Sequence, residues 1–115
     1  MIATILAALV AVEHVYILVL EMFLWRTAYG RRVFGSTQAY ADETAVLAKN
    51  QGLYNGFLAA GLAWGLWRGD WTVVRFFLGC VVVAGVFGGV TAKRSILWIQ
   101  GLPAAVALAA ALLLR

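Results

Sequence analysis

Four side chains near the start of the chain have the types that acid–base chemistry requires. Glu13, His14, Tyr16 and Glu21 place two carboxyls, an imidazole and a phenol inside an apolar stretch, residues 2–24. A charged group in the hydrocarbon of a membrane costs about 3 kcal/mol on insertion scales. Two carboxyls in different surroundings can act as an acid and a base, and an imidazole can hold the partner proton. The sequence therefore predicts Glu13, His14 and Glu21 as the catalytic candidates.

A second set of polar side chains has the types that orient a ligand. Asn50, Gln51, Tyr54 and Asn55 are spaced so that they share one face of a helix. Amide and phenol groups can hydrogen-bond the oxygen atoms of a ligand. The predicted ligand-binding residues are Tyr16, Trp25, Asn50, Gln51, Tyr54, Asn55, Trp98 and Gln100.

Each of these groups also has a purely structural interpretation, which the sequence leaves open. Glu13 and His14 can form a buried polar clamp that fixes the register of a helix, and Glu21 can pair with Arg26 or Arg94. The amides can join helices by hydrogen bonds, worth on average about 0.6 kcal/mol each in a membrane. The spacing of the acidic residues and His14 does not match a metal motif such as His-Glu-x-x-His, so we predict no metal and no cofactor.

The elements that must position these groups follow from the composition. Of 115 residues, 64% are hydrophobic and only 12% are charged, whereas a soluble domain carries about 25% charged residues. Four apolar segments approach the ~20 residues that a helix needs to cross the hydrocarbon core. Helices are expected because lipid offers no hydrogen bonds to the backbone. The sequence predicts one all-α integral membrane domain, residues 1–115, with spans at about 2–24, 50–67, 73–91 and 96–114.

The segment 26–49 is polar and separates the first two spans. We expect Gly30 and Gly35 to break it and Thr37 to cap a helix. The prediction is that helix two starts in the cytoplasm near Thr37 and enters the membrane without a break. The alternative is a separate helix at the membrane surface, followed by a kink at Lys49-Asn50.

Short connections between the later spans predict antiparallel neighbours, hence an up-down transmembrane four-helix bundle with helix two extended into the cytoplasm. Lys and Arg concentrate on one side of the predicted membrane, which places that side in the cytoplasm and both termini outside. The cytoplasmic side holds six basic residues (Arg26, Arg31, Arg32, Lys49, Lys93, Arg94) and the other side three (Arg68, Arg75, Arg115). The predicted location is the cytoplasmic (inner) membrane.

Small residues mark where helices approach closely. Glycines stand one turn apart at positions 52 and 56, 61 and 65, and 85 and 89. We favour packing within the chain over a dimer face, and a homodimer is left open. Pro103 removes one backbone hydrogen bond and is expected to kink the last span. Cys80, the single cysteine, allows no disulfide within the chain.

Antiparallel pairing brings the polar groups of the first, second and fourth spans to one zone near the cytoplasmic leaflet. The predicted function is a buried polar pocket that binds a small or lipid-like apolar molecule, with acid–base chemistry such as isomerisation, hydration or epoxide opening. The alternatives are a proton-coupled transporter that works as a dimer, and a structural accessory subunit. Membrane lipids are the expected partners. Nucleic acid is not, because the basic residues gather at span ends rather than along one face.

Two stretches resemble a known family. They are Glu13-His14-x-Tyr16-Ile17, followed by Glu21 and Trp25, and the run Asn50-Gln51-Gly52-Leu53-Tyr54-Asn55-Gly56-Phe57-Leu58-Ala59-Ala60-Gly61. They look like a family of small, mainly bacterial four-helix integral membrane proteins that is classed as a domain of unknown function. The resemblance covers nearly the whole chain. It implies a four-helix inner-membrane protein and brings no assigned catalytic residues.

Overall fold

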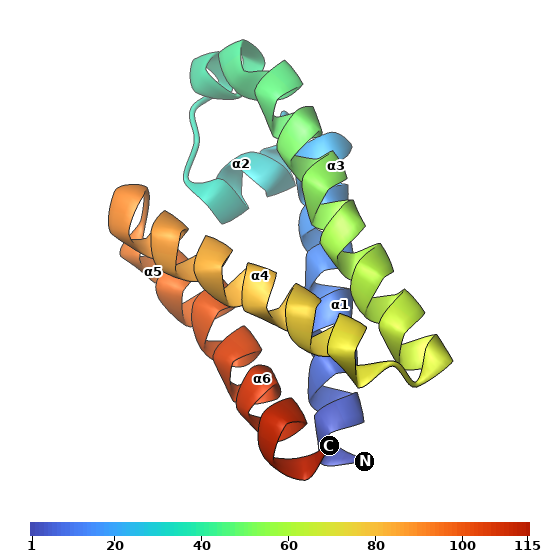
Figure 1. Cartoon of the computed structure of the whole chain (residues 1–115). Helices are drawn as coiled ribbons and strands as arrows, with labels where there is room; N and C mark the ends of the chain where they lie inside the picture. Colours follow the sequence, from blue (N-terminus) through green and yellow to red (C-terminus); the bar gives the residue numbers. More distant parts are fainter. The chain divides into compact units, whose positions relative to one another are not determined.

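Helices make up nearly the whole chain, and there is no β-strand. The computed structural model describes residues 1–115. In chain order the helices are α1 (Ile2–Met22), α2 (Ala28–Phe34), α3 (Gln38–Arg68), α4 (Trp71–Thr91), α5 (Arg94–Ile96), a π-helical turn (Leu97–Gly101) and α6 (Leu102–Leu114) (Figure 1). The last three follow one another without a gap and form one helical stretch. The predicted all-α class is confirmed.

Three helical stretches are long and apolar enough to cross a membrane. They are α1, α4 and the stretch Arg94–Leu114, each 21 residues long. The fourth predicted span, residues 50–67, lies within the 31-residue helix α3. Charged side chains in the first third of α3, and the amides of Asn50, Gln51 and Asn55 in the predicted span, lower its apolar character. A membrane crossing by α3 therefore stays a prediction.

The start of α3 agrees with the sequence analysis. The Thr37 hydroxyl accepts a hydrogen bond from the backbone N–H of Tyr40 at 3.1 Å, as a residue that caps a helix N-terminus does. The helix then continues unbroken to Arg68. The predicted start near Thr37 is confirmed, and no separate helix ends before Lys49.

Helix α2 was not predicted, and the expectation that Gly30 breaks the chain is wrong. The Thr27 hydroxyl accepts a hydrogen bond from the Gly30 N–H at 3.1 Å and so caps the start of α2. A Cβ on Gly30 would clash with the backbone oxygen of Leu24, so glycine here permits a close approach of two backbone segments. Gly35 ends α2 with φ of 66°, in the left-handed region that favours glycine.

The chain divides into two compact units. The core unit comprises residues 1–12 and 58–115, and the polar unit comprises residues 13–57. In the core unit, small and branched side chains from α1, α3, α4 and α6 form one buried apolar cluster. Its buried members are Ala7, Val10, Ala11, Leu62, Val74, Leu78, Val81, Ala104, Ala107 and Ala111. Small residues dominate because they let helices lie close together.

Glycine contacts join helices within the core unit. A Cβ on Gly85 of α4 would lie 2.5 Å from the Cα of Gly101, so the two backbones meet there. Figure 1 shows α4 running alongside the stretch from α5 to α6. Gly61 and Gly65 of α3 similarly face Phe77 and Val74 of α4. The predicted packing of glycine pairs within the chain is confirmed.

The last helical stretch contains a local irregularity just before Pro103. Residues Leu97–Gly101 form a π-helical turn, and the N–H of Leu102 donates to the carbonyl of Leu97, five residues earlier. Proline has no N–H to donate to the fourth residue before it, and π-turns are a known accommodation of such interruptions. The predicted disturbance by Pro103 thus takes the form of a widened turn.

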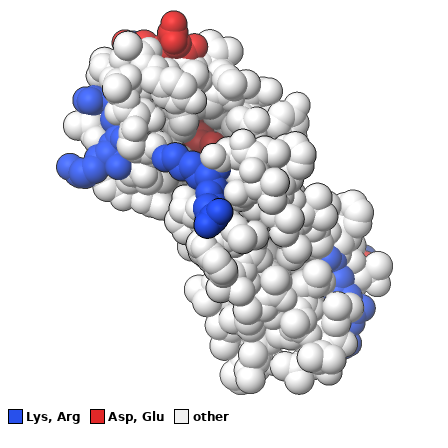
Figure 2. Space-filling view, turned by 90° about the vertical axis from the view of Figure 1, so that its left-hand side faces the viewer, with Lys and Arg blue, Asp and Glu red and all other residues white.

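Much of the surface is apolar. In an apolar 18-residue part of each of the three long apolar helices, between 22% and 28% of the residues are buried inside the chain. Figure 2 shows one face on which charged atoms are few and most atoms belong to uncharged residues. Among the exposed side chains are Phe76, Val83, Phe87 and Val90 of α4. Exposed apolar helix faces of this extent suit contact with lipid.

Candidate functional site

The polar unit joins Glu21 of α1 to Asn55 of α3. The side-chain amide of Asn55 donates to Glu21 Oε1 at 2.6 Å and also to the backbone oxygen of Gln51 at 3.2 Å. Gly52 makes this approach possible, because a Cβ there would lie 2.5 Å from Cγ of Met22. Two predicted site residues, 34 positions apart in the sequence, are thereby brought together.

Arg26 does not pair with Glu21, so that alternative is wrong. Its Nε donates to Oδ1 of Asp42 at 2.8 Å, and the Gln38 amide donates to the same oxygen at 2.9 Å. The hydrogen bond from Arg26 lowers the pKa of Asp42, with a smaller contribution from Gln38. Glu21 is therefore held by a neutral amide, while Arg26 joins the turn after α1 to the first turns of α3.

A groove of ≈ 450 Å³ lies beside Glu21, entirely within the polar unit. We call it the Glu21 groove. It is lined by Glu21, Met22, Phe23, Trp25, Arg26, Thr27, Gln38, Ala45 and Lys49. Of these residues, the sequence analysis predicted only Glu21 and Trp25 as members of the site. It treated Lys49 as a topology signal and Arg26 as a topology signal and a possible structural partner of Glu21, although basic residues near a carboxyl are also a binding signal.

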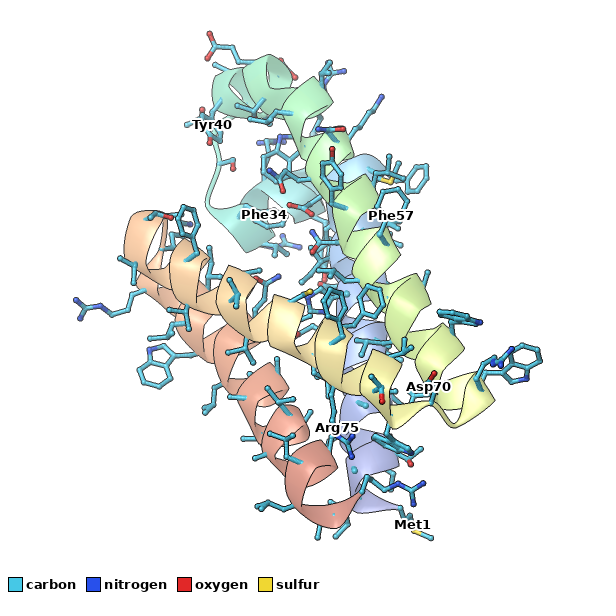
Figure 3. The ribbon with its side chains drawn as sticks, in the orientation of Figure 1. Met1, Phe34, Tyr40, Phe57, Asp70 and Arg75 are labelled. Atoms are coloured by element: carbon cyan, nitrogen blue, oxygen red, sulfur yellow. The ribbon has the colours of Figure 1, made fainter.

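Trp25 is fixed at the edge of the groove. Its indole N–H donates to the Thr44 hydroxyl at 3.0 Å. Its ring packs against Phe34 of α2, with ring centroids 4.8 Å apart. Figure 3 labels Phe34 in α2 and Tyr40 in the first turn of α3. Helix α2 therefore stabilises the orientation of one groove wall.

Glu13 and His14 lie on α1 about two turns before Glu21. Oε1 of Glu13 is 3.9 Å from Nδ1 of His14, which is longer than a hydrogen bond. His14 is 1% exposed. Oε1 of Glu13 is buried and has no hydrogen-bond donor. Because nearly all buried polar atoms in proteins are hydrogen-bonded, this oxygen marks a candidate functional group.

The other predicted ligand-binding residues of the polar unit have different surroundings. The Tyr16 hydroxyl forms a hydrogen bond of 2.5 Å with the Tyr29 hydroxyl of α2. The Tyr54 ring is exposed and meets the edge of Phe57 at a centroid distance of 5.9 Å. Asn50 and Gln51 are exposed on α3. Of the predicted polar face on α3, Asn55 is the residue that contacts Glu21.

Trp98 and Gln100 belong to the core unit. Both lie on the π-helical turn, where Trp98 is exposed and Gln100 is half-buried. Their predicted part in ligand binding stays a prediction.

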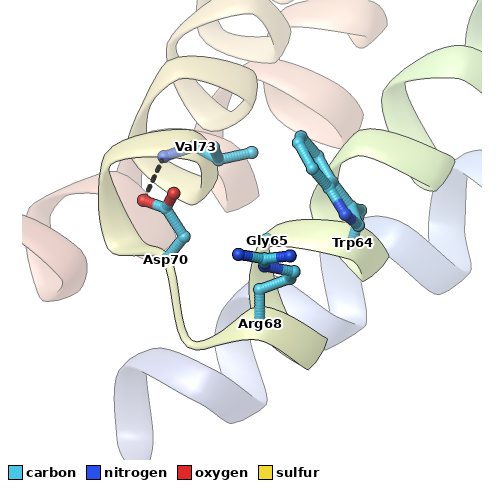
Figure 4. A pocket seen from close by; sticks show the side chains of 5 residues that line it. All are labelled: Trp64, Gly65, Arg68, Asp70 and Val73. Carbon is cyan, nitrogen blue, oxygen red and sulfur yellow. Dashed lines mark hydrogen bonds between the residues drawn. The ribbon is translucent and has the colours of Figure 1, made fainter.

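A smaller hollow of ≈ 120 Å³ lies in the core unit at the turn from α3 to α4. It is lined by Trp64, Gly65, Arg68, Asp70 and Val73 (Figure 4). Asp70 accepts hydrogen bonds from the N–H groups of Thr72 and Val73 and so caps α4. The carboxyl in this hollow is thus engaged in holding the helix start. The chain brings together no group of three or more His, Cys, Asp or Glu side chains that could hold a metal ion.

Comparisons with known proteins agree with the resemblance seen in the sequence. Residues 8–112 match the family described as "Protein of unknown function (DUF1304)". The chain is also similar to "Uncharacterized protein YpaA" of Lactococcus lactis subsp. lactis (strain IL1403). The two are 33% identical over 101 residues, which cover 84% of this chain and 85% of the relative. No solved structure matches the chain.

Proposed function

Because the chain belongs to the family of unknown function DUF1304, we propose its function from its own geometry: it is an integral membrane protein that binds a lipid-like molecule in the Glu21 groove. The observation that carries this proposal is the combination of a groove of ≈ 450 Å³ with both charged and apolar walls. Pockets for small molecules in proteins commonly measure about 300–1,000 Å³.

The membrane part of the proposal has four spans in an up-down bundle. Three helical stretches have the length and apolar character to cross, and residues 50–67 of α3 supply the fourth crossing. Six of the nine basic residues fall in the predicted connections between the first and second spans and between the third and fourth, which supports a cytoplasmic position for these connections, with both termini outside. The groove then opens at the cytoplasmic leaflet of the inner membrane.

The walls of the groove support a lipid-like ligand. Met22, Phe23 and Ala45 offer apolar surface, and Phe23 is 70% exposed. Glu21 and Lys49 offer charge in the same groove. A molecule with a polar head and an apolar tail can satisfy both kinds of wall, whereas a fully apolar molecule leaves the charged groups without partners.

Filling the groove tests this proposal. Ala45→Phe adds bulk to a lining residue, and Ala39→Phe adds the same bulk to an exposed position six residues earlier on α3. Native mass spectrometry of the detergent-solubilised protein measures how much lipid it retains. We expect Ala45→Phe to lower the affinity for lipid by about tenfold or more, with Ala39→Phe unchanged. Equal lipid retention by the two variants would contradict the proposal.

Acid–base chemistry or proton movement at Glu13 is a second candidate, as part of an enzyme or of a proton-coupled dimeric transporter. The specific observation is the buried Oε1 of Glu13 without a hydrogen-bond donor, beside His14. Glu13→Gln keeps the shape and removes the ionisable group. If this variant restores growth or lipid composition in cells that lack the wild type, and melts at a higher temperature, the pair is a structural clamp. Loss of rescue with an intact fold supports the proton role.

A further inference from the structure

We infer that the Glu21 groove selects a zwitterionic phospholipid whose head group carries a primary ammonium beside a phosphate. This inference rests on the proposed function and specifies the ligand. It depends on the placement of opposite charges in one groove and on the partners that each charge already has.

The acidic side of the groove is Glu21. Its Oε1 accepts a hydrogen bond from Asn55, whose amide is also held by the Gln51 carbonyl. A carboxylate has about four acceptor positions on two oxygens, so Asn55 fixes the group without using its full capacity. A primary ammonium supplies N–H donors for the remaining positions, and such charge-assisted bonds are roughly twice as strong as neutral ones.

The basic side of the groove is Lys49 with Arg26. Lys49 is exposed on α3 and forms no ion pair. Arg26 uses its Nε to hold Asp42, which leaves the two terminal nitrogens of its guanidinium for another acceptor. Ammonium and guanidinium groups are the side chains that proteins use to bind phosphate.

The separation of the two charges explains the choice of a zwitterion. Glu21 and Lys49 line the same groove, but no ion pair within 4.0 Å joins them. A head group with both signs can place its ammonium at Glu21 and its phosphate at Lys49. An anionic lipid without an ammonium would be repelled by the carboxylate of Glu21. A cationic amphiphile would be repelled by Lys49 and Arg26, so the groove disfavours both classes of lipid.

The apolar part of the lipid has surface to contact beside these charges. Met22 and Phe23 line the groove at the end of α1. An acyl chain against these side chains would be covered on one side by protein. The tail therefore adds affinity and the head group decides specificity.

The test compares three phospholipids with the same acyl chains: phosphatidylethanolamine, phosphatidylcholine and phosphatidylglycerol. Binding to the full-length protein in detergent is titrated by native mass spectrometry. We expect the wild type to prefer phosphatidylethanolamine over each of the others by about tenfold. Glu21→Gln should remove this preference, and Lys49→Gln should weaken binding of all three lipids.

Matched controls change the same side chains outside the groove. Glu43→Gln removes a carboxylate from the exposed face of α3, and Lys93→Gln removes an ammonium from the core unit. Both are expected to keep the wild-type preference. If Glu21→Gln fails to fold, mono- and dimethylated phosphatidylethanolamine provide a second measurement on the wild type. Affinity should fall stepwise as each methyl group removes an N–H donor.

The outcomes separate this inference from the proposed function. Equal affinity for the three lipids, or an unchanged preference in a folded Glu21→Gln variant, would overturn the inference. The proposed function would survive either result as long as Ala45→Phe still lowers lipid retention relative to Ala39→Phe. If the Ala45→Phe variant retains as much lipid as the Ala39→Phe variant, both the inference and the proposed function are overturned.

Discussion

At the scale of single residues, Glu21 is a carboxyl inside an apolar segment whose partner is a neutral amide. Sequence reasoning predicted Glu21 and Asn55 as members of one site, because antiparallel helices joined by a connecting segment bring those positions to similar depth. The structure gives them a hydrogen bond of 2.6 Å. The partner of Arg26 was not predictable in this way, since it depends on the path of residues 23–37 and on the position of Asp42.

The Arg26–Asp42 pair makes a prediction about pH. The guanidinium of Arg26 lowers the pKa of Asp42 below its ordinary value of 3.8, so the pair stabilises the folded segment fully at any pH above that value. Its contribution is lost as the pH falls through the lowered pKa. We expect Asp42→Asn to melt at a lower temperature than the wild type at pH 7. The difference should disappear in strongly acidic buffer.

Thermal melting of the detergent-solubilised protein across this pH range measures the effect. Glu43→Asn is the control, because Glu43 neighbours Asp42 on α3 but forms no ion pair. A melting difference between the wild type and Asp42→Asn that stays constant into strong acid would contradict the assignment.

At the scale of elements, close approach between helices depends on glycine. The spacing of the glycines predicted such close approach. It did not predict which glycines lie against the backbone of another segment. Gly30 illustrates the difficulty. The sequence analysis expected this glycine to break a helix, whereas in the structure it lies within α2 and lets α2 pack closely against Leu24 in the turn after α1. Spacing shows that small residues recur, and only coordinates show what each one touches.

Two glycines of α4 provide a matched prediction. A Cβ on Gly85 would lie 2.5 Å from the Cα of Gly101, whereas a Cβ on Gly79 would meet nothing within 4 Å. Backbone cannot yield as a flexible side chain can, so Gly85→Ala should destabilise the core unit by about 1–3 kcal/mol. Gly79→Ala should be neutral or stabilise by up to about 1 kcal/mol, because alanine favours the helix.

Melting temperatures of the two variants, measured side by side in the same detergent, decide the matter. The helix and the substitution are the same in both, so helix propensity cancels. Equal stability of the two variants would show that α4 and the π-helical turn do not meet at Gly85.

At the scale of the whole molecule, the composition was enough to predict the all-α fold class. It was not enough to establish how many helices cross the membrane. The apolar lengths predicted helices, and the structure confirms them. Three helical stretches suit a membrane by length and composition, and α3 does not, because it carries a charged first third and amides at Asn50, Gln51 and Asn55. Hydropathy cannot distinguish a polar face that lines a site from a helix that stays in water.

Chemical labelling tests the fourth crossing. With Cys80 replaced by alanine, single cysteines at Ser36 and at Arg68 lie just before and at the end of α3. We expect a membrane-impermeant maleimide to label the Ser36→Cys variant in inverted vesicles and the Arg68→Cys variant in intact spheroplasts. Labelling of both variants from the same side would mean that α3 does not cross.

The π-helical turn changes how the last span must be aligned with its relatives. One additional residue is accommodated within Leu97–Gly101, so residues on its two sides are offset by about 100° from the faces that a regular helical wheel assigns them. A wheel drawn over the whole stretch would misjudge whether Trp98 shares a side with the alanines of α6. A deletion of one residue inside this turn would let the helical segments on both sides keep their register against α4. A deletion elsewhere in the span would shift the register of one of them.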